Sequence, residues 1–234
     1  MLLSSNTANQ SWGNKGIYMI KSSDVLNSKL SAILNSKRSK WDYANSILYE
    51  MCEKTPLHDD ADIIVGKIWL IGRSYAAAIE RRKNKDDTDD DDFYYEIVAP
   101  KMLSIGNTLD ERITELKQYP VLSEENLDLV LNTHKLLTDA FFDITELEKR
   151  SLASKYLHFH CPQMFFIYDS RANLGVRKWV KLDKQRVYKH YPCGCDVEYA
   201  DFCVRMIELQ EYCKQKFGYT PSPRKIDDFL LYSK

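Results

Sequence analysis

The sequence predicts an all-α, two-lobed protein. Glycine is scarce, at 8 of 234 residues, and several stretches repeat apolar residues every three or four positions, which is the spacing of one helix face. A hydrophobic share of 44% is sufficient for a core, and no stretch shows a convincing strand pattern. We therefore expect residues 1–234 to form one helical unit of two closely packed lobes.

Three helices are expected in the first half of the chain. Residues 23–36 and 41–54 have amphipathic patterns. Residues 60–82 carry apolar rows on two sides and predict a helix that is buried deep in the fold. The segment 81–92 contains no apolar residue, so we expect a solvated acidic loop at about 81–95.

Helices resume after this loop. The expected ranges are 96–118, 123–142, 145–160, 196–217 and a short tail helix from about Pro223. Thr145, followed by Glu148 three residues later, matches the capping-box pattern and predicts a helix start there. His134 shares an apolar face with its neighbours, so we interpret it as a core histidine.

Charge is unevenly distributed along the chain. Residues 1–150 hold 19 Lys/Arg against 25 Asp/Glu, whereas residues 151–234 hold 14 against 9. Within 171–190 seven basic residues face one acid, Asp183. Such a basic stripe is typical of a surface that binds a polyanion, although an ordinary solvated helix face has the same composition.

The segment SLASKYLHFHCPQMFFIYDSRA at 151–172 is the most informative motif. It begins as a helix, passes Pro162, continues through an apolar and aromatic run, and then presents Asp169 in a Ser-Arg-Ala turn. Apolar neighbours such as Phe165 and Phe166 make an ionised carboxylate costly. Asp169 is therefore a candidate for a functional acid.

Together with KIWLIGRSYAAAIERR at 67–82 and SPRKIDDFLL at 222–231, this motif resembles the helix-hairpin-helix DNA glycosylase superfamily. The combination is similar to an atypical bacterial branch. The resemblance implies excision of a damaged or modified base from double-stranded DNA, with Asp169 stabilising the sugar cation and 145–190 as the hairpin and catalytic-aspartate region. It also suggests phage defence through removal of hypermodified cytosines.

Further site residues follow from the same resemblance. The candidate base pocket comprises Trp69, Arg73, Tyr75, His158 and Tyr168, and for Arg73 a structural ion pair is the favoured interpretation. The candidate DNA contacts are Lys149, Arg150, Ser151, Lys155, Arg171, Arg177 and Lys178.

The sequence also departs from the family pattern. The hairpin region ELEKRSLASK has no glycine, so we expect phosphate binding to depend on Lys149, Arg150 or Ser151. The position of the lysine that attacks the sugar in bifunctional members falls on Ser151, which favours monofunctional base excision.

Cys193, Cys195, Cys203 and Cys213 do not have the spacing of an iron–sulfur ligand set. We expect reduced thiols, no metal and no cofactor.

Two other hypotheses remain open. The chain could be a non-catalytic DNA-binding module, which the missing hairpin glycines favour, or a helical protein-interaction module. No run of 18 apolar residues occurs and the first residues are polar, so we expect a cytoplasmic monomer without a membrane span.

Overall fold

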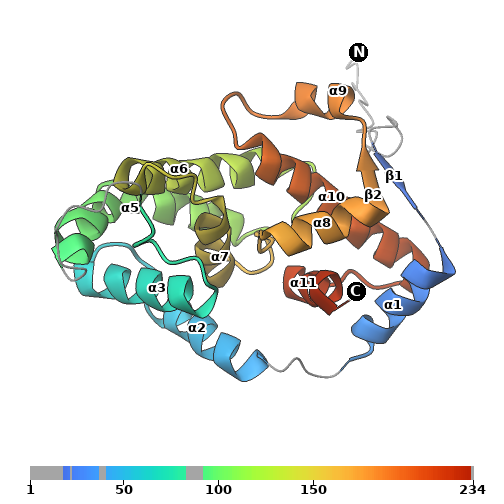
Figure 1. Ribbon diagram of the computed structural model, residues 1–234, viewed down its shortest axis with the longest axis horizontal. Coiled ribbons are helices and arrows are strands. Elements are labelled where there is room, and N and C mark those ends of the chain that lie inside the picture. The colour runs from blue at the N-terminus through green and yellow to red at the C-terminus, as the bar shows by residue number, and fades with distance from the viewer. Residues whose placement is uncertain (1–17, 22, 37–40, 83–91, 233–234) are drawn as a thin grey trace, which may run out of the picture.

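The computed structural model describes residues 18–21, 23–36, 41–82 and 92–232 (Figure 1). The helices are α1 Asp24–Leu34, α2 Asp42–Lys54, α3 Ala61–Ser74, α5 Ala99–Leu116, α6 Leu127–Thr145, α7 Arg150–His160, α8 Ser170–Trp179, α9 Lys184–Val187, α10 Val197–Phe217 and α11 Pro223–Tyr232, with a π-helical turn, Phe93–Val98, before α5 and a 3-10 turn, Tyr188–His190, after α9. The described part of the chain is thus mostly helical, as the sequence predicts.

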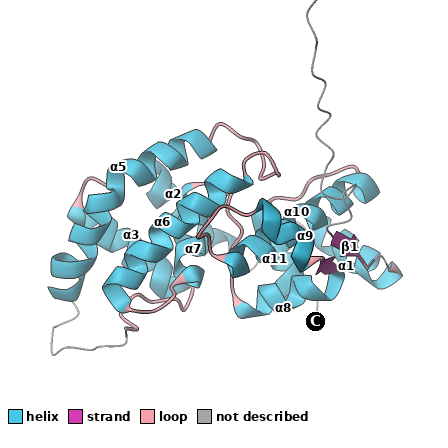
Figure 2. Ribbon diagram, turned by 90° about the horizontal axis from the view of Figure 1, so that it is seen from above, coloured by secondary structure: helices cyan, strands magenta, loops and turns pink. Residues whose placement is uncertain are grey.

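The helices form two packed groups. In the first, α7 packs against α2, α3 and α6, and α5 packs against α3 and α6. In the second, α11 packs against α1, α8 and α10. Figures 1 and 2 show the two groups side by side, with the segment from α7 to α8 crossing between them.

The structure contains two short strands, for which the sequence shows no convincing pattern. β1 (Tyr18–Ile20) pairs antiparallel with β2 (Val180–Leu182), which directly follows α8, and both strands contact α10. Each strand has only three residues, which is too short for an alternating pattern to stand out in the sequence.

The helix expected at 60–82 ends at Ser74. Ala76 adopts a left-handed backbone conformation with φ 51°. The Ala77 amide donates to the Gly72 carbonyl at 2.8 Å, and the Ala76 amide donates to the Arg73 carbonyl at 3.3 Å. These two bonds form a Schellman motif that stops the helix. Ile79 is still buried, so the apolar pattern continues after the helix has ended.

Thr145 is not a helix start. It is the last residue of α6, and its hydroxyl donates to the Phe141 carbonyl at 2.7 Å and accepts from the Leu147 amide at 3.2 Å. The following residue, Glu146, takes the left-handed conformation with φ 53°. The capping-box pattern therefore predicted the wrong boundary, and α7 begins at Arg150. Most of the acidic loop expected at 81–95 lies outside the described residues.

We predict that Ala76→Gly stabilises the protein. A residue with a Cβ loses roughly 1–2 kcal/mol in the left-handed region, and this gain exceeds the added flexibility of glycine in the unfolded chain. The expected increase in the free energy of unfolding is about 0.5–1 kcal/mol, measured by urea denaturation.

Ala44→Gly, at an exposed position inside α2, removes the same methyl group and is the matched control. It should lower the free energy of unfolding by about 0.5–1 kcal/mol. Equal losses in the two variants would contradict a left-handed Ala76.

Candidate functional site

Asp169 lies in a cavity of about 500 Å³ between the two groups of helices. The cavity has walls from α2, the end of α3, α7, the start of α8 and α11. Its polar lining residues include Asn45, Tyr75, Lys155, Asp169, Arg171, Arg224 and Asp227. Because these residues come from both groups, the cavity depends on how the groups pack together.

Asp169 is the N-cap of α8. Its backbone is extended, and its Oδ1 accepts a hydrogen bond from the Ala172 amide at 2.7 Å. The side chain is half-buried. The carboxylate therefore lies at the positive end of the α8 dipole, with the exposed Arg171 two residues away.

Buried side chains hold the chain that leads to Asp169. The Tyr168 amide donates to Ser154 Oγ at 3.0 Å, and the Tyr168 carbonyl accepts from Lys155 Nζ at 2.9 Å and from the Ser151 hydroxyl at 3.1 Å. All three partners are on α7, so α7 fixes the residue immediately before Asp169.

Earlier in the same segment, side chains also bond the backbone carbonyls of Phe165 and Phe166. His158 Nδ1 lies 2.7 Å from the Phe165 carbonyl, and the Tyr199 hydroxyl donates to the Phe166 carbonyl at 3.1 Å. A carbonyl only accepts, so His158 Nδ1 carries the proton and Nε2 accepts from Tyr49. Burial lowers the pKa of His158 to about 4. His158 is thus a neutral structural residue.

Lys155 is the buried cation of the cavity. It is 2% exposed, and its ammonium contacts Ser151 Oγ at 2.5 Å in addition to the Tyr168 carbonyl. Burial lowers its pKa to about 8, and the nearby Asp169 charge opposes this shift. Lys155 therefore faces the candidate acid rather than an exposed phosphate-binding surface.

The predicted base-pocket residues do not come together. Only Tyr75 lines the cavity with Asp169, and its hydroxyl donates to Asn45 Oδ1 at 2.7 Å. Trp69 is 44% exposed, and Arg73 lies over its ring while pairing with Glu80. The ion pair favoured for Arg73 is therefore present. Neither Trp69 nor Arg73 lines the cavity.

Tyr168 also points elsewhere, because its hydroxyl donates to Glu198. The residue is buried, and Arg150 lies over its ring. Burial and the Glu198 carboxylate raise the pKa of Tyr168 to about 12.

The hairpin residues proposed for phosphate binding have intramolecular partners. Lys149 donates to the carbonyls of Ala78 and Arg81. Arg150 Nε lies 2.6 Å from Asp196 Oδ2, and Arg150 Nη1 lies 3.1 Å from Glu198 Oε2. The Ser151 hydroxyl donates to the Tyr168 carbonyl. Exposed positive charge lies instead on α8, at Arg171 beside the cavity and at Arg177 and Lys178 in the last turn of the helix.

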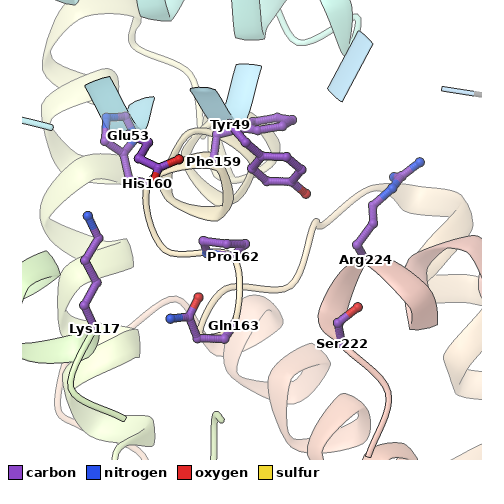
Figure 3. A pocket seen from close by; sticks show the side chains of 9 residues that line it. All are labelled: Tyr49, Glu53, Lys117, Phe159, His160, Pro162, Gln163, Ser222 and Arg224. Atoms are coloured by element: carbon purple, nitrogen blue, oxygen red, sulfur yellow. The ribbon is translucent and has the colours of Figure 1, made fainter. Parts of the chain in front are cut away.

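A larger cavity, of about 780 Å³, shares Arg224 with the Asp169 cavity. Figure 3 shows Lys117 on one side, Arg224 on the other, and Pro162 and Gln163 between them. Two charged residues of this larger cavity, Glu53 and Lys117, are exposed, so their charges remain solvated. The Asp169 cavity, with its buried charges, is the better candidate for chemistry.

Sequence reasoning missed several polar lining residues of the cavity, among them Asn45, Arg224 and Asp227. Arg224 Nη1 lies 2.6 Å from Asp227 Oδ2. The i, i+3 spacing of these opposite charges predicts an ion pair on one face of the tail helix, but it does not show that this face lines a cavity.

The cysteines expected to be reduced are free, including Cys193, Cys195, Cys203 and Cys213. Within the described residues, no group of three or more His, Cys, Asp or Glu side chains is placed to hold a metal ion. No helix in the described ranges is both long and apolar enough to cross a membrane.

Comparison with protein-family models, curated proteins and solved structures finds no match.

The capping role of Asp169 makes a prediction about stability. Asn is as good an N-cap as Asp, whereas Ala loses the cap at a cost of about 1 kcal/mol. We expect Asp169→Asn to leave the free energy of unfolding nearly unchanged and Asp169→Ala to lower it by about 1 kcal/mol in urea denaturation. A large loss in Asp169→Asn would contradict the capping geometry.

Proposed function

We propose that this protein is a DNA glycosylase that excises a damaged or modified base and leaves an abasic site. The observation that carries this proposal is a half-buried carboxylate, Asp169, at a cavity of about 500 Å³ that also contains Lys155, Arg171 and Arg224. The volume is in the range of small-molecule sites, about 300–1,000 Å³. A base that leaves the duplex stack needs such a pocket.

Asp169 would act on the deoxyribose. Cleavage of an N-glycosidic bond develops positive charge on the sugar, and a carboxylate at about 4 Å stabilises it by on the order of 4 kcal/mol at an effective dielectric near 20. This corresponds to roughly a thousandfold in rate. The same carboxylate would accept a proton from the attacking water.

Duplex DNA would lie along α8. Arg171 is exposed in the first turn of this helix, next to the acid that would face the flipped nucleotide, and Arg177 and Lys178 are exposed in its last turn. Arginine and lysine contacts to phosphates position a duplex without reading its sequence. This arrangement supports a polyanion partner. The modified base, including a hypermodified cytosine of phage DNA, would be selected within the cavity.

The alternative is a DNA-binding module without catalysis. Its support is the predicted hairpin region, which contains no glycine and in which Lys149, Arg150 and Ser151 are engaged by other parts of the protein. This alternative shares the DNA surface on α8 and differs only in the role of Asp169. A protein-interaction module would require neither the DNA surface on α8 nor a catalytic Asp169.

The proposal predicts that Asp169→Asn binds DNA with unchanged affinity but releases no base. Wild-type protein should release a base from at least one member of a panel of modified DNAs, including DNA with glucosylated hydroxymethylcytosine. Abasic sites are revealed by heat or alkali. Wild-type binding without release from any substrate would favour the non-catalytic module, and equal release by Asp169→Asn would contradict its catalytic role.

The DNA surface makes a separate prediction. Removing the Arg177 and Lys178 charges, as Arg177→Gln with Lys178→Gln, should reduce the slope of log affinity against log salt by about 1–2, because each phosphate contact contributes about 0.9. Gel-shift titrations at several salt concentrations measure this slope.

The matched control is Lys214→Gln with Lys216→Gln, which removes two exposed charges at the far end of α10. This variant should retain the wild-type slope. The same slope for all three proteins would place the DNA away from α8.

A further inference from the structure

α11 brings a second carboxylate, Asp227, into the cavity that contains Asp169. Asp227 is 1% exposed, whereas Asp169 is half-buried at a helix end. The Asp169 charge is among the effects that raise the pKa of Asp227. The cavity thus holds two acids in different environments.

The two oxygens of Asp227 are not equivalent. Oδ2 accepts from Arg224 Nη1 at 2.6 Å. Oδ1 is buried and has no hydrogen-bond partner among the described residues. A buried polar oxygen without a partner is costly, and here it belongs to a residue that lines a cavity. A ligand in the cavity would supply the missing partner.

We propose that Asp227 is a catalytic acid that gives the proton on its Oδ1 to the departing base. This inference rests on the proposed glycosylase function. As the N-glycosidic bond breaks, its electron pair goes to a ring nitrogen or exocyclic acceptor of the base, and the proton from Asp227 neutralises that charge. Water forms the new bond to the sugar carbon and gives its proton to Asp169. Proton exchange with solvent restores both acids.

The different environments of the two acids match these two roles. Asp169 accepts an amide hydrogen bond at the positive end of a helix dipole, which suits a carboxylate that stabilises a cation. Burial raises the pKa of Asp227 to about 7, with the charge of Arg224 opposing the shift. A pair of acids whose environments separate their protonation in this way is the usual basis of acid and base assignment.

Several charged or titratable groups from neighbouring elements act on Asp227. They are Arg224 and Asp228 on α11, Asp169 before α8, Lys155 on α7, Tyr49 on α2 and Tyr75 after α3. Lys155 matters most for interpretation, because its pKa is lowered to about 8. A pH profile must therefore separate Lys155 from Asp227.

The test is the single-turnover rate of base release as a function of pH, for wild-type protein and Asp227→Asn, on a substrate that the wild type cleaves. Wild-type activity should fall as pH rises above about 7, because the acid loses its proton. Asp227→Asn should be slower by about 10²–10⁴-fold at pH 6, a typical contribution of general acid catalysis, and should lack this fall.

Asp228→Asn is the matched control. Asp228 is the neighbouring acid on α11, and its Oδ1 lies 3.2 Å from Arg224 Nη2. Unlike Asp227, it does not line the cavity. At pH 6 the Asp228→Asn variant should retain the wild-type rate within about twofold. Its activity should still fall as pH rises, but at a lower pH than in the wild type, because the Asp228 charge is among the effects that raise the pKa of Asp227. Thermal unfolding and DNA binding establish that each variant is folded.

The outcomes are distinguishable. If the wild type releases no base from any DNA, the glycosylase proposal fails and this inference fails with it. If the wild type is active and Asp227→Asn has an equal rate, or has a slower rate but retains the fall above pH 7, the acid is not Asp227. If Asp227→Asn does not fold, a wild-type profile without a fall near pH 7 overturns the inference by itself.

Discussion

The candidate site depends on how an irregular segment is held between two groups of helices. Residues 161–169 connect α7 to α8 with little regular structure, so their buried backbone groups need partners. Side chains supply them. Ser151, Ser154 and Lys155 bond both the amide and the carbonyl of Tyr168, and other buried side chains bond Phe165 and Phe166. This network fixes the position of Asp169 without a sheet or a glycine-rich loop.

The network also explains why a lysine is buried there. The Lys155 ammonium is not an exposed cation that waits for a phosphate, because the Tyr168 carbonyl and Ser151 hydroxyl already satisfy it. Its charge nevertheless reaches the cavity, where the carboxylates of Asp169 and Asp227 lie. Burying this mixture of charges costs free energy that packing alone does not explain. Such clusters of buried charges are frequent at functional sites.

Periodicity predicted the helices that are amphipathic along their whole length. α2 and α10 begin within one residue of their expected starts, and α11 begins at Pro223. It failed where the backbone leaves the helix while the apolar pattern continues, as at Ala76, and where a threonine side chain bonds its own helix, as at Thr145. The strands were too short to show a pattern.

The candidate site was predictable only in part. Asp169 stood out because an acid followed an apolar run. Asp227 did not, because its burial comes from packing of α11 against α8 and α10, which no local pattern contains. Trp69 and Arg73 were predicted to share the pocket with Tyr75, but α3 ends between Arg73 and Tyr75, and only the tyrosine lines the cavity.

The most direct measurement is a crystal structure of Asp169→Asn bound to a duplex that contains the base released by the wild type. The modified base should lie outside the stack in the cavity, next to Tyr75 and within hydrogen-bond distance of Asp227 Oδ1, with the sugar carbon facing residue 169. A duplex bound on another surface, or a base that remains stacked with the cavity empty, would contradict the proposed function.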